Sequence, residues 1–462
     1  MSDRMEPEEL ADALKRLADW ATEHAPKPES PVLRLLRRHF GADPADMPVV
    51  SRSLSPWDRP NFQVAVDAWS DGRDVEVVGL PVAHGYRAGL AELARTSPWA
   101  PSLEPGAPEH VTVPLGENES ITCVESGMWL IQDDDGPLVL MLVSTEHGMG
   151  PSLELQVMAP ARERGERVLG ELRALMTERN VYRGRVLELA SRYFHEDEGA
   201  PLTVRTLPAI AREQIVLPEG VLERVERQAF GIARHAERLR ASGRHLRRGL
   251  LLYGPPGTGK TLTAMYLAAT MPERTVVLLT GQALGAVGMS VDLATALQPA
   301  MVVLEDVDLV AMDREFEPTN AILFELLNAM DGLDEDHDVL FVLTTNRADL
   351  LEPALAARPG RVDEAVELPL PDAHGRRRLI ALYGEGLELE ATRDDALIDA
   401  LEGVSPAFIR ELLRRAALLA AETSDGALRV SEQLLERAHR ELRDGSGQLT
   451  NVLLGAQRPT GG

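Results

Sequence analysis

One segment, Gly254–Thr261, has the residues and spacing of a loop that holds nucleotide phosphates. It reads G-P-P-G-T-G-K-T, directly after the apolar run Leu250–Tyr253 and before a segment rich in helix-forming residues. Glycines let a backbone wrap around phosphate oxygens, and the amides of a helix N-terminus attract anions. A lysine followed by a hydroxyl can reach the β- and γ-phosphates and a Mg²⁺ ion. An incidental glycine-rich turn would not need the flanking strand and helix, so the segment predicts a site for ATP and Mg²⁺ formed by Gly254, Pro255, Pro256, Gly257, Thr258, Gly259, Lys260, Thr261 and Leu262.

Two carboxylates follow another apolar run. Glu305 and Asp306 come directly after Met301–Leu304. Ligands of parallel sheets bind outside the carboxyl ends of the strands, so these acids are predicted to face the crevice of the phosphate loop. One carboxylate can hold Mg²⁺ while the next orients the attacking water. Taken alone, the pair could equally be a solvated acidic turn.

The elements that must position these residues show a regular alternation in the second half of the chain. Near-continuous apolar runs alternate with helical segments, as in a parallel sheet covered on both faces. From His374 onward the pattern is helical, with Phe408, Leu412 and Leu413 on one stripe. We therefore expect an α/β domain followed by a helical region, and the strands of the domain include Leu250–Tyr253, Val276–Leu279, Met301–Leu304, Leu340–Leu343 and Ala365–Leu368.

The first half of the chain has a different pattern of apolar and polar residues. Helical patterns occupy Glu6–Thr22, Val32–Phe40 and Ala161–Leu189. Short apolar or alternating runs, separated by turn residues, are typical of an antiparallel sheet and occupy Val75–Val78, Val111–Val113, Ile121–Val124, Met128–Ile131, Leu138–Val143 and Leu153–Met158. The predicted organisation is an α+β N-terminal domain over 1–195, an α/β subdomain over 203–371, a helical subdomain over 372–443 and a disordered tail over 444–462.

Composition narrows the function classes. The chain has 462 residues and a formal net charge of −25, which disfavours non-specific binding to nucleic acid. Its single cysteine, Cys123, cannot form an intrachain disulfide. Met1–Leu10 has no apolar leader, and no apolar run is long enough to span a bilayer. A cytoplasmic protein without membrane attachment is expected.

Residues 203–443 resemble the AAA+ ATPases, especially the AAA group that includes proteasomal ATPases, membrane-bound AAA proteases and Bcs1-like proteins. The resemblance implies a P-loop NTPase fold with a C-terminal helical lid. It rests on five motifs that occur in the family's order, namely Arg248–Thr261, Leu326–Gly332, Thr344–Arg347, Arg358–Asp363 and Gly403–Ala407.

The resemblance also implies roles for single residues. Asn346 would orient the attacking water or sense the γ-phosphate, although capping of a turn is the simpler alternative. Arg358 and Arg361 would be arginine fingers that act on the nucleotide of a neighbouring subunit, which implies a ring and most simply a homohexamer. The implied metal ligands are Thr261 and Glu305, and the implied catalytic residues are Glu305, Asp306, Asn346, Arg358 and Arg361.

Three features depart from the usual family pattern. The acidic pair is Glu305 then Asp306, as in Bcs1-like proteins, where most relatives have Asp then Glu. The stretch Thr280–Met289 lacks the aromatic residue that substrate-threading relatives carry. An extra residue at Ala356–Ala357 leaves the division of roles between the two arginines open.

These features favour an ATP-fuelled remodeller of proteins that selects an unidentified partner through residues 1–195. A nucleotide-dependent assembly switch with slow hydrolysis is the alternative, and a nucleic-acid motor ranks third because of the acidity. The segment His195–Gly199 lacks the second histidine of the H-E-x-x-H motif, so no zinc peptidase of that type is expected.

Overall fold

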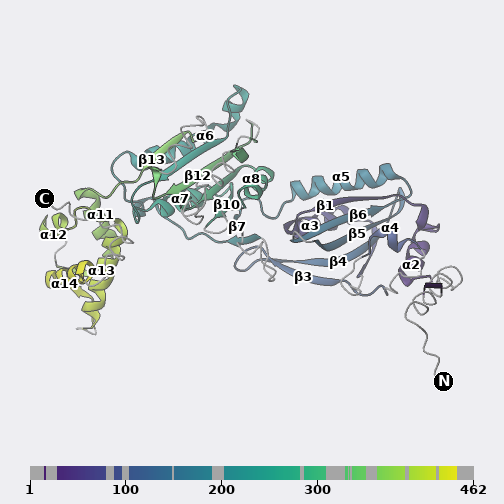
Figure 1. Cartoon of the computed structure of the whole chain (residues 1–462), viewed down its shortest axis with the longest axis horizontal. Coiled ribbons are helices and arrows are strands. Elements are labelled where there is room, and N and C mark those ends of the chain that lie inside the picture. The colour runs from purple at the N-terminus through teal and green to yellow at the C-terminus, as the bar shows by residue number, and fades with distance from the viewer. Residues whose placement is uncertain are drawn as a thin grey trace, which may run out of the picture. The chain divides into compact units, whose positions relative to one another are not determined.

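The chain forms two compact units, which Figure 1 shows. One comprises Met1–Val181 with Arg192–Pro201, and the other comprises Tyr182–Ser191 with Leu202–Gly462. The structure is a computed structural model, and it describes residues 15–16, 29–79, 88–95, 104–147, 150–189, 202–280, 286–308, 328–330, 332, 336–349, 362–390, 395–422 and 426–444. The predicted helix Glu6–Thr22, apart from residues 15 and 16, and the predicted tail from residue 445 lie outside these ranges.

The first unit is built on an antiparallel sheet. Its strand order is β1-β6-β5-β4-β2, with β3 paired to β4 beside that path. The predicted runs Ile121–Val124 and Met128–Ile131 belong to one long strand, because β4 continues through Gly127 without a break. The strand bounds are Val49–Leu54 (β1), Asp74–Gly79 (β2), Glu109–Pro114 (β3), Ser120–Asp133 (β4), Gly136–His147 (β5) and Gly150–Met158 (β6).

Helices cover both faces of this sheet. The helices α3 (Arg59–Ser70) and α5 (Arg162–Glu178) pack on one face through a core that includes Phe62, Trp129 and Leu172. The helices α2 (Pro31–Phe40) and α4 (Leu90–Leu93) pack on the other face through a second core. Neighbouring residues of β4 enter opposite cores because side chains alternate across a strand. The N-terminal α+β expectation therefore matches the described elements.

The helical pattern predicted over Ala161–Leu189 is only partly correct. The helix α5 ends at Glu178, and Val186–Leu189 forms the strand β7. Its sequence V-L-E-L alternates between half-buried and buried side chains, which is the period of a strand. Because β7 pairs with β10 (Thr275–Leu279), it belongs to the second unit. Tyr182–Ser191 thus belongs to the second unit, while Val181 and Arg192–Pro201 belong to the first.

The second unit contains the predicted parallel sheet. Its order is β13-β9-β12-β11-β10-β7-β8, and every pairing is parallel except that of β7 with β8. Four of the five predicted apolar runs lie entirely in strands, and the fifth, Ala365–Leu368, extends one residue past β13. The bounds are Leu202–Arg205 (β8), Arg248–Tyr253 (β9), Thr275–Leu279 (β10), Ala300–Leu304 (β11), Val339–Thr345 (β12) and Glu364–Glu367 (β13).

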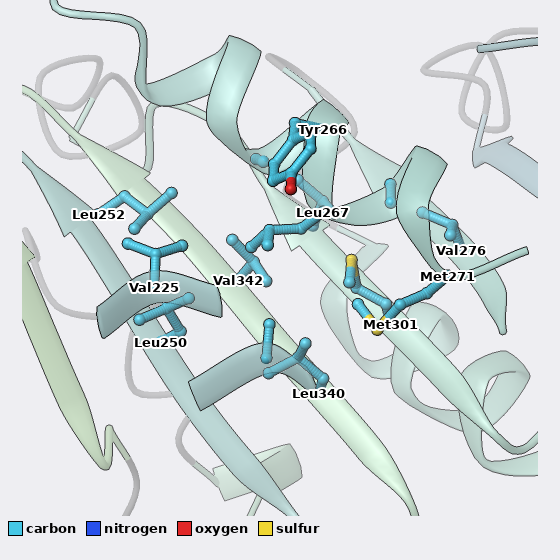
Figure 2. Close-up of a cluster of buried hydrophobic side chains, with 14 of the residues drawn as sticks. Val225, Leu250, Leu252, Tyr266, Leu267, Met271, Val276, Met301, Leu340 and Val342 are labelled. Atoms are coloured by element: carbon cyan, nitrogen blue, oxygen red, sulfur yellow. The ribbon is translucent and has the colours of Figure 1, made fainter. Parts of the chain in front are cut away.

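Alternate strand residues form the core beneath two helices. Figure 2 shows Leu250 and Leu252 of β9 beside Val342 of β12, in a cluster that also holds Leu267 of α7 (Lys260–Thr270). The helix α6 (Val221–Ala241) adds Val225 to the same cluster. The helix α8 (Val287–Ala296) packs on β10 and β11. The central strands are buried along their whole length, as sequence runs without polar interruption require.

The C-terminal helices have a core of their own. It contains Phe408, Leu412 and Leu413, the predicted stripe. The elements are α11 (Ala373–Tyr383), β14 (Glu388–Leu389), α12 (Asp395–Ala400), α13 (Pro406–Ala421), β15 (Arg429–Val430) and α14 (Glu432–Asp444). Within the described part of the chain, every helix is too short or too polar to cross a membrane.

Candidate nucleotide site

The phosphate loop joins β9 to α7 and depends on its glycines. Gly254, Gly257 and Gly259 have φ values of 147°, 77° and 96°, in the region that disfavours side chains. A Cβ atom at Gly254 would lie 2.3 Å from the carbonyl oxygen of Leu368. The backbone can therefore turn into the start of α7 only with glycine at these positions, and the first amides of that helix are left to face an anion.

Lys260 closes the loop from inside. Its Nζ atom donates to the carbonyl oxygens of Gly254 and Pro255, each at 2.9 Å, and the residue is buried. Burial lowers the pKa of the Lys260 ammonium to about 8, although the nearby carboxylates of Asp306 and Asp308 act in the opposite direction. Two carbonyl oxygens thus hold the Lys260 ammonium inside the loop. The phosphate oxygens of a bound nucleotide would take the place of these carbonyl oxygens as its partners.

Glu305 and Thr261 supply oxygen atoms suited to a hard cation. The Thr261 side chain forms a hydrogen bond with Glu305, whose Oε1 atom is buried without a hydrogen-bond partner in the structure. Burial raises the pKa of Glu305, and the charges of Asp306 and Glu188 raise it further. Mg²⁺ binds proteins through a few carboxylate or hydroxyl oxygens and completes its shell with phosphates and water. An unpartnered carboxylate oxygen beside a hydroxyl fits that requirement.

Asp306 occupies a strained position. Its φ of 48° makes it the one non-glycine residue with positive φ among those described. Its amide donates to Thr344 Oγ1 at 3.0 Å, and Asn346 Nδ2 donates to its Oδ1 at 3.3 Å. The pKa of Asp306 is raised mainly by burial, while Lys260 and Asn346 act against the rise. Thr344 and Asn346, at the end of β12, therefore fix the position of Asp306 and its carboxylate.

Asp308 is a site residue that the sequence reasoning missed. It is 4% exposed and accepts hydrogen bonds from Thr345 Oγ1 at 2.8 Å and from the Asn346 amide at 3.1 Å. It thus fixes the backbone that carries the Asn346 side chain. The available sequence signal was a further acid, Asp308, two residues after Asp306 in the acidic segment that follows the apolar run.

The lid meets the phosphate loop through the predicted segment Gly403–Ala407. The amide of Ala407 donates to the carbonyl oxygen of Gly257 at 3.2 Å. Ser405 is fully buried, and its hydroxyl accepts from the amide of Phe408 at the start of α13. A Cβ atom at Gly257 would lie 2.8 Å from the Ser405 hydroxyl oxygen. The lid and the loop are therefore in direct backbone contact.

The structure brings most predicted site residues to one edge of the sheet. Lys260, Thr261, Glu305, Asp306 and Asn346 all follow the carboxyl ends of adjacent parallel strands or open the helix after one. Leu262, on the first turn of α7, is 38% exposed. The two predicted arginine fingers, Arg358 and Arg361, lie outside the described residues, and their roles stay predictions.

The sheet order, the glycine loop and the acidic strand end define a P-loop nucleotide-binding domain. A family model described as "ATPase family associated with various cellular activities (AAA)" matches residues 250–370. Residues 250–370 of the second unit therefore form an AAA domain, the type of domain found in AAA+ ATPases. The resemblance of the Glu305–Asp306 order to Bcs1-like proteins stays a prediction.

Three curated relatives illustrate the range of similar proteins. The 26S proteasome regulatory subunit S10B homolog B of Arabidopsis thaliana is 32% identical over 188 residues, which are 37% of this chain and 47% of the relative. The proteasome-activating nucleotidase of Pyrococcus horikoshii is 34% identical over 202 residues, 40% of this chain and 50% of the relative. The ATP-dependent zinc metalloprotease FtsH 1 of Conexibacter woesei is 32% identical over 240 residues, 48% of this chain and 36% of the relative. The chain thus spans half or less of the length of these relatives.

Proposed function

We propose that the chain binds Mg·ATP and hydrolyses it in a ring assembly to remodel a protein partner. The observation that carries the proposal is the convergence of Lys260, Thr261, Glu305, Asp306 and Asn346 at one edge of the parallel sheet. Lys260, Asp306 and Asn346 have hydrogen-bond partners within the site. The buried Oε1 atom of Glu305 has no hydrogen-bond partner, so it is available to a metal ion. A bound Mg²⁺ ion would neutralise charge on the phosphates.

Each residue has a task in this proposal. Lys260 would exchange its two carbonyl partners for phosphate oxygens, and Thr261 and Glu305 would hold Mg²⁺. Asp306 orients the attacking water and accepts its proton, and Asn346 fixes the Asp306 carboxylate through their hydrogen bond. Positioning of this kind is the main contribution that proteins make to phosphoryl transfer.

The assembly and the partner rest on the relatives and on the resemblance. Two of the relatives are named as a subunit or an activator of the proteasome, which supports work on proteins. Arg358 and Arg361 would complete the site of a neighbouring subunit, which requires a closed ring, most simply a homohexamer. The first unit would recognise the partner.

A slow assembly switch is the second candidate. The shorter side chain of Asp306 reaches less far than the glutamate that most relatives carry there, and Thr280–Met289 lacks an aromatic residue. Both features favour tight nucleotide binding with little mechanical work.

One experiment separates the two candidates. Steady-state ATP hydrolysis is measured with and without an unfolded protein, and oligomer size is measured by light scattering with ATP, with ADP and without nucleotide. A remodeller is stimulated by the unfolded protein. A switch keeps slow turnover and changes oligomer size with the nucleotide. If the chain shows neither nucleotide binding nor turnover, the proposed function is wrong.

A further inference from the structure

The strand β1 has an open outer edge in the first unit. It ends the strand order, and no strand in the described part of the chain pairs with its outer side. The amide of Ala159 donates to the Pro48 carbonyl oxygen, which sets the phase of the pairing with β6. In an antiparallel ladder every second residue bonds the same neighbour, so Val50 and Arg52 bond β6. The backbone groups of Val49, Ser51 and Ser53 therefore point outward.

The opposite edge of the same sheet is treated differently. At β2, Gly79 exchanges two backbone hydrogen bonds with Gly106, at 2.9 and 3.0 Å. Proteins usually cover or interrupt sheet edges because exposed edges pair with other chains. The β2 edge is partly covered by Gly106, whereas the open edge of β1 is free to pair with another chain.

A groove runs along the open edge. It has a volume of about 660 Å³ and lies between Pro48–Arg52 and one side of α5. Glycines of α5 shape it: a Cβ atom at Gly165 would lie 2.7 Å from Val50 Cγ2, so the helix lies close to the strand there. Five residues further along α5, Gly170 is exposed, and a Cβ atom there would meet nothing within 4 Å. A groove between an edge strand and a helix is the shape that binds extended peptides by strand addition.

The side chains that line the groove carry a net positive charge, which favours an acidic ligand. Arg52 lies in it, half-buried, on the side of the sheet that carries α5, because its partner Leu155 belongs to that core. Arg162 also lines the groove but is paired with Glu166 at 2.8 Å, so Arg52 leaves a net positive charge in a chain of net charge −25. A strand added at this edge would meet Arg52 in a non-hydrogen-bonded pair, whose Cα atoms are only about 4.5 Å apart. An acidic side chain is favoured opposite Arg52.

We propose that the outer edge of β1 binds an extended segment of a partner protein, which adds as a strand and carries an acidic and an apolar side chain two residues apart. The acidic side chain pairs with Arg52. The apolar side chain lies opposite Val50, beside Leu169 and the open space at Gly170. A second copy of β1 fits less well, because Val49–Leu54 contains no acidic residue. The inference deepens the proposed recognition role of the first unit and rests on it.

The test is a selection of random decapeptides, displayed on phage, on the immobilised full-length chain. Peptides that are enriched are synthesised with a fluorophore, and their affinities are measured by anisotropy. We expect the enriched sequences to share an acidic and an apolar residue two positions apart. Ser51→Pro removes an outward amide that an edge strand does not need for its own sheet, and Gly170→Trp fills the groove. Each variant is expected to weaken binding about tenfold or more, a loss of about 1.4 kcal/mol.

The controls separate the proposal from its alternatives. Gly231→Trp places the same side chain at a helical glycine of α6 with equally open surroundings, and it should leave binding unchanged. Arg52→Glu should shift the selected peptides from acidic to basic. Circular dichroism melting checks that each variant is folded, and ATP turnover is measured separately, so a failure of either proposal is distinguishable from a failure of the other.

Three results would overturn the inference. The first is that no peptide is enriched, or that enriched peptides bind the Ser51→Pro and Gly170→Trp variants as well as the unchanged chain. The second is that Ser51→Pro converts a dimer into a monomer without affecting peptides, which would assign the edge to a second copy. The third is that peptides bind only after residues 1–28 are removed, which would assign the edge to the chain's own N-terminal segment.

Discussion

At the scale of single residues, the neighbouring acids Glu305 and Asp306 have different surroundings, which support different proposed roles. Glu305 is half-buried beside Thr261, and its buried Oε1 atom has no hydrogen-bond partner, as expected of a metal ligand. Asp306 is turned by its positive φ and held by Asn346. Strain at a non-glycine residue persists only where surrounding contacts fix it, and it often marks a functional group. The geometry supports the assignment of Asp306 as the base.

Replacing Asp306 tests that assignment. Asp306→Asn keeps the size of the side chain but cannot accept a proton. We expect Mg·ATP to bind with nearly unchanged affinity, measured by calorimetry, while steady-state hydrolysis falls about a hundredfold or more, as loss of a general base requires. Glu305→Gln is the matched control and should weaken the dependence of binding on Mg²⁺. Substantial hydrolysis by Asp306→Asn would move the base to Glu305.

The buried lysine predicts a pH dependence of nucleotide binding. Burial lowers the pKa of Lys260 from 10.5 to about 8, so the ammonium is protonated below pH 8 and loses its proton above it. Phosphates bind the charged form, so ATP affinity should fall above pH 8, by at most about tenfold per pH unit. Calorimetry in buffers of different ionisation enthalpy should also show proton uptake on binding above pH 8. Lys260→Arg stays protonated, and any remaining affinity should lose this pH dependence; an equal dependence would assign it to another group.

At the scale of elements, the site depends on the register between β11 and β12. Asp306 and Asp308 follow β11, and the residues that hold them end or follow β12. Because β12 pairs with β11 in parallel, Leu304 lies beside Leu343, and the two polar turns meet. The carboxyl edges of two adjacent strands thus form one hydrogen-bonded unit.

Asp308 tests this link between strands. Asp308→Leu removes the acceptor of the buried Thr345 hydroxyl and of the partly buried Asn346 amide, and leaving a buried donor unsatisfied costs about 1–3 kcal/mol. We expect a lower free energy of unfolding and a lower kcat, with KM for ATP less affected. Asp308→Asn keeps one carbonyl oxygen, so it should recover most of the stability and kcat. If both variants behave alike, the charge of Asp308 matters more than its hydrogen bonds.

The sequence predicted most of the parallel sheet and the residues that gather at its edge, for physical reasons that are visible in particular elements. Four of the parallel strands, β9 to β12, were recognisable because no charged residue interrupts their apolar runs, whereas β13 contains Glu367 and is buried mainly at Val366. β7 was mistaken for the end of a helix, since four residues following a long helical pattern do not define a period. Its true position depends on pairing with β10, far along the chain. The Asp308 contacts were missed for the same reason, because they join residues 37 and 38 positions apart.

At the scale of the whole molecule, each active site of the proposed ring would be formed by residues from two neighbouring subunits. Arg361 would act on the nucleotide of a neighbour. Arg361→Ala mixed with the unchanged chain should therefore reduce ATP turnover more than dilution does, because one altered subunit disables the site next to it. Turnover is measured across mixing ratios at constant total protein. A strictly linear decrease would show that each subunit hydrolyses ATP alone.

The most direct test of the central claim is steady-state ATP hydrolysis by the purified chain across a series of protein concentrations, with Lys260→Ala as the control. A shared, ring-built P-loop site predicts turnover that depends on Lys260 and rises per subunit as concentration favours assembly. Absence of turnover at every concentration while Mg·ATP still binds would contradict hydrolysis by this site and favour the switch. Turnover that is the same in Lys260→Ala would contradict the phosphate loop as the catalytic site.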